Sequence, residues 1–130
     1  MDLDLTSKTA VVTGASIGIG RAIAKGLARE GVRVVAVARR KDLLESLVQE
    51  VKAQGNGSVI PLTQDMMEDD AAAKLTARAM SELGRVDILV NNAGGSRPLP
   101  VDSPDSAWDE AIALNFTSYR NLAHALLPQM

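Results

Sequence analysis

Short apolar segments rich in valine alternate along this chain with longer segments whose apolar residues recur at helical spacing. The nearly continuous apolar character of the short segments is typical of strands covered on both faces, as in a parallel sheet. Strands alternating with crossover helices predict an α/β fold built on a doubly wound parallel sheet. The expected strands are residues 9–13, 33–38, 58–62 and 86–91, and the expected crossover helices are residues 19–30, 41–53 and 68–83.

The end of the chain is expected to form a helix that follows a loop over residues 95–102. Ser103 and Pro104 suit an N-cap followed by proline in the first helical turn. The helix is expected to continue, with a break, to the end of the chain, and Trp108 is expected to pack against its first part. Its apolar stripe lacks partners within this sequence and consists of Ile112, Phe116, Ala123 and Leu127.

The composition argues against several classes of function. A length of 130 residues with 46% hydrophobic content predicts one domain without a second domain or repeat. The net charge of -2 does not favour nucleic-acid binding. The absence of cysteine and the single histidine, His124, argue against a disulfide framework or a metal centre. Neither a signal peptide nor a membrane-spanning segment is recognisable, so we expect a cytoplasmic protein.

Residues 13–20 read TGASIGIG and stand between an expected strand and an expected helix. Because glycine lacks a Cβ atom, Gly14, Gly18 and Gly20 allow a sharp turn and a close approach of a ligand to the backbone. The exposed N–H groups at the start of the helix would attract a pyrophosphate. Glycines also serve ordinary turns between strands and helices, so this segment alone leaves both interpretations open.

A second segment, residues 86–94, reads VDILVNNAG and ends the fourth expected strand. Together the two segments resemble the glycine and NNAG motifs of the short-chain dehydrogenase/reductase family, and the similarity extends along the whole chain. The resemblance implies a Rossmann-type sheet with strand order 3-2-1-4, in a dinucleotide-binding domain over residues 1–130 that is incomplete at its C-terminal end. It also implies an NAD(P)-dependent oxidoreductase that interconverts a carbonyl and an alcohol.

The resemblance assigns two groups of residues to the cofactor. Asn91, Ala93 and Gly94 would flank its ribose rings, whereas Asn92 would be mainly structural. Asparagines at a strand end can equally satisfy neighbouring backbone groups. The pyrophosphate and adenosine-ribose side would be bound by Gly14, Ser16, Ile17, Gly18, Ile19 and Gly20.

Asp65, just beyond the third expected strand, matches the family's aspartate that accepts a hydrogen bond from the adenine amino group. The Met66 backbone would lie beside it. A carboxylate is a strong acceptor, which suits this role. Asp65 can also serve as the N-cap of a helix beginning near Glu68, and both roles can hold at once.

The second expected strand ends in Val37-Ala38-Arg39-Arg40, where family members specific for NAD place an acidic residue. Arg39 instead offers a fork of donors suited to a 2′-phosphate, with Arg40 beside it. The alternative is a solvated basic turn. Many NADP-dependent members carry a basic residue just before the second glycine of the first motif, and this chain has Ile17 there. NADP(H) is expected in preference to NAD(H).

Asn115 matches the family's catalytic asparagine, which lies at a helix break and helps to hold a proton-relay water. The alternative is an ordinary helical asparagine. The family's catalytic serine would follow a fifth strand that this sequence lacks, and its Tyr-x-x-x-Lys pair is absent, because Ala123 stands four residues after the only tyrosine, Tyr119. We therefore expect the chain by itself to catalyse no hydride transfer, even if it binds a dinucleotide.

Two classes of function remain: the N-terminal part of an oxidoreductase, or a non-catalytic nucleotide-binding module. The unpartnered apolar helix and a fourth strand left as a bare edge favour the oxidoreductase. The resemblance also implies a small-molecule carbonyl or alcohol substrate, with 3-oxoacyl reduction as one possibility, and a homo-oligomer in the full-length form. Nucleic-acid and membrane partners are not expected.

Overall fold

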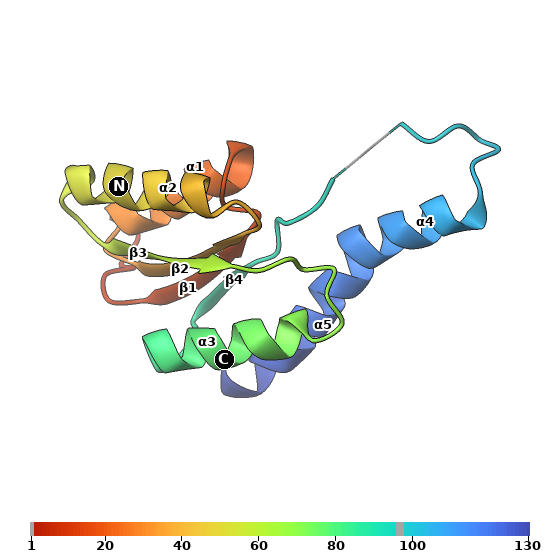
Figure 1. Ribbon diagram of the computed structural model, residues 1–130. Helices are drawn as coiled ribbons and strands as arrows, with labels where there is room; N and C mark the ends of the chain where they lie inside the picture. Colours follow the sequence, from red (N-terminus) through yellow and green to blue (C-terminus); the bar gives the residue numbers. More distant parts are fainter. Residues whose placement is uncertain (1, 96–97) are drawn as a thin grey trace.

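A computed structural model describes residues 2–95 and 98–130, which form a four-stranded parallel sheet in the order β3-β2-β1-β4 (Figure 1). The predicted doubly wound sheet and its strand order are therefore confirmed. The fourth strand is shorter than predicted, because β4 pairs with β1 only over Ala10–Val12. The strands are β1 (Thr9–Thr13), β2 (Arg33–Ala38), β3 (Ser58–Thr63) and β4 (Ile88–Val90).

Helices cover both faces of the sheet (Figure 1). Because successive strand residues point to opposite faces, Val12 and Val34 pack beneath α1 and α2, whereas Val11 and Val35 pack against α3 and α5. The strands are therefore buried on both sides, as their continuous apolar character predicts. The covering helices are α1 (Gly18–Arg29), α2 (Lys41–Gln54), α3 (Ala71–Leu83) and α5 (Ser118–Leu126).

Two helices begin later than their sequence patterns suggest. The helix expected from residue 68 begins as α3 at Ala71, after a turn in which the Glu68 N–H donates to the Asp65 carbonyl at 3.2 Å. The helix expected from Pro104 begins as α4 (Asp105–Ile112), because Pro104 keeps an extended ψ of 154° and stands at the N-cap. The predicted loop over residues 95–102 includes residues 96 and 97, which lie outside the described part of the chain.

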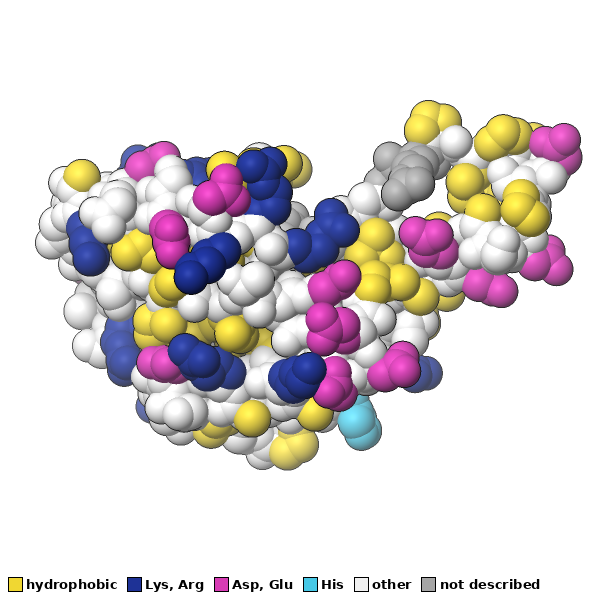
Figure 2. Space-filling model, viewed as in Figure 1, with side chains coloured by type: hydrophobic (Ala, Val, Ile, Leu, Met, Phe, Trp, Pro, Cys, Tyr) yellow, Lys and Arg dark blue, Asp and Glu magenta, His cyan; other side chains and the backbone are white. Residues whose placement is uncertain are grey.

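The α4 helix projects away from the sheet and buries none of its residues (Figure 1). Trp108 is 45% exposed, so the prediction that it packs against this helix is wrong. The apolar side chains of Ile112, Phe116 and Leu127 are also exposed, as expected for a stripe without a partner in this sequence. In Figure 2 the projecting arm carries both hydrophobic and acidic side chains. Among the helices described, none is long and apolar enough to span a bilayer.

An ion-pair cluster joins α1 to α2 at the surface. Glu50 of α2 accepts from Lys25 and from Arg21 of α1, each at 2.7 Å. Arg21 also donates to the Leu43 carbonyl at 2.9 Å, so its guanidinium binds both a side chain and a backbone carbonyl of α2. The hydrogen bonds from Lys25 and Arg21 lower the pKa of Glu50 to about 2. The cluster therefore stays ionised well into acid.

The depressed pKa of Glu50 predicts an acid dependence of stability. The contribution of this carboxylate is fully present above its ordinary pKa of 4.5 and is lost as the pH falls from there to about 2. The Glu50→Gln variant should show a shallower decrease in the free energy of unfolding over this range, measured by urea titration at a series of pH values. Glu45→Gln, at an exposed position of the same helix, is the control. Parallel acid profiles for the wild type and Glu50→Gln would contradict the prediction.

Candidate functional site

The carboxyl edge of the sheet brings together three segments that the sequence predicts to be functional. Thr13 at the end of β1 is in register with Val37 of β2, and Val12 of β1 pairs with Val90 of β4. The chain leaving β1 therefore lies between the chains leaving β2 and β4. Ligands of open α/β sheets bind beyond this edge, where the strand order reverses on either side of the first strand.

The turn after β1 depends on glycine for two different reasons. Gly14 and Gly18 have φ angles of 64° and 61°, in the left-handed region that favours glycine. A Cβ atom on Gly20 would lie 2.2 Å from the Gly14 carbonyl oxygen and 2.4 Å from Asn92 Nδ2, so no larger residue fits there. Beside Gly18 a Cβ atom would meet nothing within 4 Å, so this part of the turn borders open space.

The N-terminus of α1 opens onto the same edge. Ile17, the N-cap residue, has extended backbone with φ -143°, and no described side chain caps the helix or places a carboxylate in its first turn. The first N–H groups of a helix have no intrahelical acceptor, and they form the positive end of its dipole. Ile17 and Ile19 flank them with apolar side chains that are 66% and 74% exposed. This end of α1 is chemically suited to an anion.

The Asn91–Asn92–Ala93–Gly94 segment is bonded to the end of β1. The Thr13 hydroxyl accepts from the backbone N–H groups of Asn92 at 3.0 Å and Ala93 at 2.9 Å. The Asn92 side chain donates to the Gly14 carbonyl at 3.1 Å, which matches the structural role expected for this residue. Asn91 donates to the Tyr119 carbonyl at 3.3 Å and so connects the segment to α5.

Asn115 lies in a π-helix, Ala113–Thr117, which interrupts the helical segment at the expected break. Its Nδ2 donates to the Ala111 carbonyl at 2.9 Å and to the Gly95 carbonyl at 3.0 Å. Its Oδ1 accepts from the Gly95 N–H at 3.2 Å. A π-helix often marks a functional site, and this one directs the carboxamide of Asn115 onto the loop that follows Gly94.

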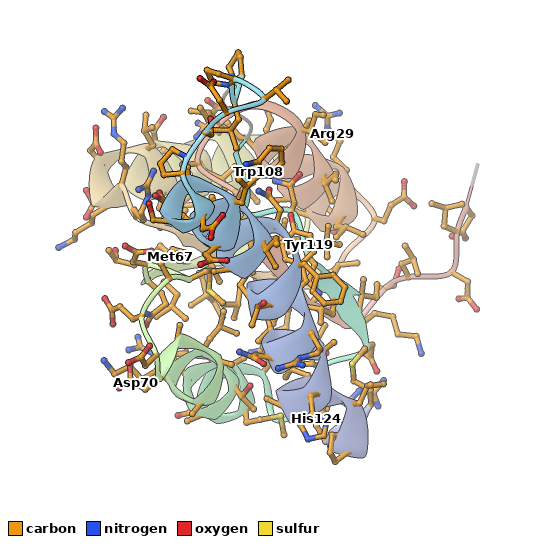
Figure 3. The ribbon with its side chains drawn as sticks, turned by 90° about the vertical axis from the view of Figure 1, so that its right-hand side faces the viewer. Arg29, Met67, Asp70, Trp108, Tyr119 and His124 are labelled. Carbon is orange, nitrogen blue, oxygen red and sulfur yellow. The ribbon has the colours of Figure 1, made fainter. Side chains whose placement is uncertain are left out.

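Tyr119 also lies against this loop, which the sequence interpretation did not anticipate. A Cβ atom added to Gly94 would lie 3.1 Å from the Tyr119 hydroxyl and 2.6 Å from Asn115 Oδ1. Figure 3 looks onto this edge and shows Tyr119 midway along the segment between Trp108 and His124. The four-residue spacing of Asn115 and Tyr119, which places two side chains on one helical face, was the available signal. His124 is exposed at the far end and has no place in the site (Figure 3).

The two arginines after β2 have different surroundings. Arg40 is bonded to the Asp42 carboxylate at 3.1 Å, and this hydrogen bond lowers the pKa of Asp42. Arg39 is exposed and makes no ion pair or side-chain hydrogen bond with the residues that the structure describes. Of these two arginines, and within the part of the chain that the structure describes, Arg39 is therefore the one whose guanidinium is uncommitted.

Asp65 follows β3 at the outer part of the same edge. Its Oδ1 accepts from the Met67 N–H at 2.9 Å and so stabilises the turn after β3. The alternative role of Asp65 as the N-cap of the next helix is excluded, because α3 begins at Ala71 with Asp70 at its N-cap. Met66 is buried at 8% exposure and anchors this turn in the core, while Met67 points outward (Figure 3). Among residues 2–95 and 98–130, no group of acidic and histidine side chains could hold a metal ion.

Comparison with known proteins identifies related sequences and structures. The family model described as short chain dehydrogenase matches residues 8–130. A short chain dehydrogenase of Pseudocercospora fijiensis is 46% identical over 129 residues, which cover 97% of this chain and 41% of that protein.

Two solved structures superpose closely on this chain. A 7α-hydroxysteroid dehydrogenase in complex with NADH and 7-oxo glycochenodeoxycholic acid has a TM-score of 0.94 at 36% identity, covering 99% of this chain and 50% of that one. The L-sorbose reductase of Gluconobacter frateurii in complex with NADPH and L-sorbose has a TM-score of 0.92 at 36% identity, covering 100% of this chain and 50% of that one. The chain thus spans half or less of the length of these relatives.

The packing around Gly20 predicts that alanine substitution at two glycines of α1 changes the free energy of unfolding very differently. Gly20→Ala should lower the free energy of unfolding by about 1–3 kcal/mol, because the added methyl group collides with the Gly14 carbonyl and with Asn92. Gly26→Ala should be neutral or stabilising by up to about 1 kcal/mol, since nothing lies within 4 Å of its Cβ position. Urea unfolding of both variants checks the prediction. Equal stability of the two variants would refute the crowding argument.

Proposed function

The chain belongs to the short-chain dehydrogenase family, and we propose that it forms the dinucleotide-binding part of an oxidoreductase that interconverts a carbonyl and an alcohol with a nicotinamide cofactor. The observation that carries this proposal is the uncapped N-terminus of α1, which opens between the ends of β1 and β4. The solved relatives named with NADH and NADPH support the same class of cofactor.

The glycine turn fits a pyrophosphate. The close packing of Gly14 and Gly20 against the Asn92 segment seats the start of α1 at the crevice, and the open space beside Gly18 leaves room for phosphate oxygens. We assign the contacts on this side to the backbone of Ser16, Ile17, Gly18, Ile19 and Gly20. The exposed side chains of Ile17 and Ile19 offer apolar surface to the rest of the dinucleotide.

The adenine is assigned to the edge formed after β3. One oxygen of Asp65 accepts from the Met67 N–H, and the other makes no hydrogen bond with the residues described. That second oxygen is available to accept from the adenine amino group, with the Met66 backbone beside it. The cap that Asp65 places on its own turn fixes the carboxylate for this contact.

The preference for NADP(H) over NAD(H) is assigned mainly to Arg39. No acidic residue follows β2 at the point where a carboxylate would bind the ribose hydroxyls, because residues 38–41 read ARRK. Arg39 offers its full fork of donors to a 2′-phosphate, whereas Arg40 shares its charge with Asp42 at 3.1 Å. Arg40 therefore contributes a weaker, second positive charge.

The nicotinamide side is assigned to Asn91, Ala93 and Gly94, whose loop is fixed by Thr13 and Asn115. When bound, the dinucleotide gives or takes the hydride. The chain's own residues bind the dinucleotide and set its orientation. The paired hydrogen bonds of Asn115 with the Gly95 peptide, at 3.0 and 3.2 Å, hold the loop in place. In the proposed role, Asn115 positions this loop and takes part in holding a water of the proton relay.

The wider function of the protein follows the same family pattern. We propose a small-molecule carbonyl or alcohol as the substrate, a homo-oligomer as the assembled form and the cytoplasm as the location. The exposed apolar side chains of Ile112, Phe116 and Leu127 support self-association, since burial against a second copy stabilises exposed apolar surface.

The charge at Arg39 predicts how the cofactors are distinguished. Arg39→Ala should weaken NADPH binding by about 1.5–3 kcal/mol, the range for a hydrogen bond to a charged group, with little effect on NADH. Lys52→Ala, at an exposed position on α2, should leave both affinities unchanged. Calorimetric titration of the variants with both dinucleotides measures the difference. Equal losses of affinity for NADPH and NADH would show that Arg39 does not bind the 2′-phosphate.

The absence of the family's Tyr-x-x-x-Lys pair from this sequence predicts that the 130-residue chain alone transfers no hydride. The amide of Asn115 neither gives nor takes a proton at neutral pH, and general acid catalysis typically contributes about 100- to 10,000-fold. Oxidation of NADPH, followed by absorbance against a panel of ketones and 3-oxoacyl thioesters, should not exceed a control without protein. Turnover above that control that disappears in Asn115→Ala would place the catalytic group within this chain and disprove the prediction.

A further inference from the structure

The amino edge of the sheet holds a second hollow, which the proposed function does not use. Its volume is about 310 Å³, and it is lined by residues 6–9, by Arg33 at the start of β2, and by Leu83 and Arg85 after α3. Thr9 is in register with Arg33, so the hollow lies where β1 and β2 begin. The five residues of β1 separate it from the glycine turn, a distance of about 16 Å at the usual rise of a strand. In Figure 1 this is the edge opposite α4.

Three cations line this hollow, and among the residues with a described placement only one of them has a carboxylate partner. Arg85 is paired with Asp87 at 2.7 Å. Burial raises the pKa of Asp87, but the hydrogen bonds from Thr9 and Arg85 lower it by more, so the carboxylate stays ionised and compensates Arg85. Lys8 makes no ion pair within the described part of the chain, and the side chain of Arg33 donates there only to the Glu82 carbonyl, at 2.9 Å.

The nearest acidic side chain on α3 is also engaged elsewhere. The Glu82 carboxylate accepts from Arg78 at 3.0 Å, so it does not compensate Arg33. With Asp87 bonded to Arg85 and to Thr9, two positive charges remain at the hollow. An anion that enters there meets both of them without displacing an existing ion pair of the described residues.

The wall formed by Thr6 and Ser7 adds hydroxyl groups on a fixed backbone. Ser7 has a φ of 69°, and its N–H donates to the Gly31 carbonyl at 3.2 Å. The next N–H, of Lys8, donates to the Leu5 carbonyl at 3.0 Å, and Thr6 packs against Gly31. Neither hydroxyl has a hydrogen-bond partner among the residues described. Their donors are therefore free for a ligand and are held in place by the turn.

We propose that this hollow binds the phosphate group of a small molecule through Lys8, Arg33, and the hydroxyls of Thr6 and Ser7. The remaining guanidinium donors of Arg33 suit two phosphate oxygens, and the ammonium of Lys8 supplies a compact second charge. Residues 6–8 and Arg33 belong to two separate chain segments, so together their donors can bind several oxygens of a tetrahedral anion. A volume of about 310 Å³ accommodates a phosphate with a small attached group.

Titration with inorganic phosphate, followed by backbone amide NMR of the purified protein, tests this site. Saturable shifts are expected at Ser7, Lys8 and Arg33, and they should persist when NADP is present at saturation. Lys8→Gln and Arg33→Gln should each weaken binding about tenfold or more, the loss expected for one charge-assisted hydrogen bond. Lys8→Arg should retain binding, and Lys52→Gln, on the helix that covers the opposite face of the sheet from α3, should leave it unchanged.

Several results would overturn the proposal. Equal shifts with sodium chloride at the same ionic strength would show general screening rather than a site. Shifts confined to Gly18 and Gly20, or complete loss of the phosphate effect on adding NADP, would assign the anion to the carboxyl edge. Unchanged affinity in both Lys8→Gln and Arg33→Gln, with spectra of a folded protein, would exclude these two side chains as ligands.

Discussion

The structure depends on one set of hydrogen bonds, those that join the ends of β1 and β4. The Thr13 hydroxyl accepts two backbone N–H groups of the Asn92 segment, and the Asn92 side chain donates to the Gly14 carbonyl at 3.1 Å. Because β4 pairs with β1 at only three positions, these bonds fix where the chain leaves both strands. Gly20 then brings α1 against the same point. The crevice, the open helix N-terminus and the bordering loop are all consequences of this junction.

The fold was largely predictable because strand burial and helix periodicity are local properties of the sequence. Valine-rich segments covered on both faces indicate a parallel sheet, and the two recognised motifs give the strand order. The element ends were less predictable. Residues 68–70 suit a helix by pattern, but the turn fixed by Asp65 delays α3 to Ala71. Likewise, Pro104 fits a first helical turn in principle, yet its extended ψ of 154° leaves it outside α4.

For the candidate site, the sequence nominates residues but does not give the contacts between them. Asn115 could be assigned a helix break from its resemblance, whereas its bonds to Gly95 span twenty residues of sequence and depend on the π-helical rotation. The approach of Tyr119 to Gly94 follows from the same rotation. Trp108 shows the opposite error, because an aromatic residue suggested packing on a helix that has no buried residue. Contacts between distant segments need the three-dimensional arrangement.

Net charge is a poor guide to anion binding in this protein, because pairing is decided locally. The overall charge is -2, yet the carboxylates lie next to particular cations: Glu50 accepts from Lys25, and Asp87 accepts from Arg85. This pairing leaves Arg39 uncommitted beyond β2, at the edge where the helix dipole of α1 also favours negative charge. The carboxyl edge and the amino edge of this parallel sheet differ in which cations lack a carboxylate partner. Among the described residues, the carboxyl edge combines Arg39 with the free N–H groups of α1, whereas the amino edge combines Lys8 and Arg33 with hydroxyls on a fixed turn. The phosphate-bearing ligands that we propose for the two edges differ accordingly.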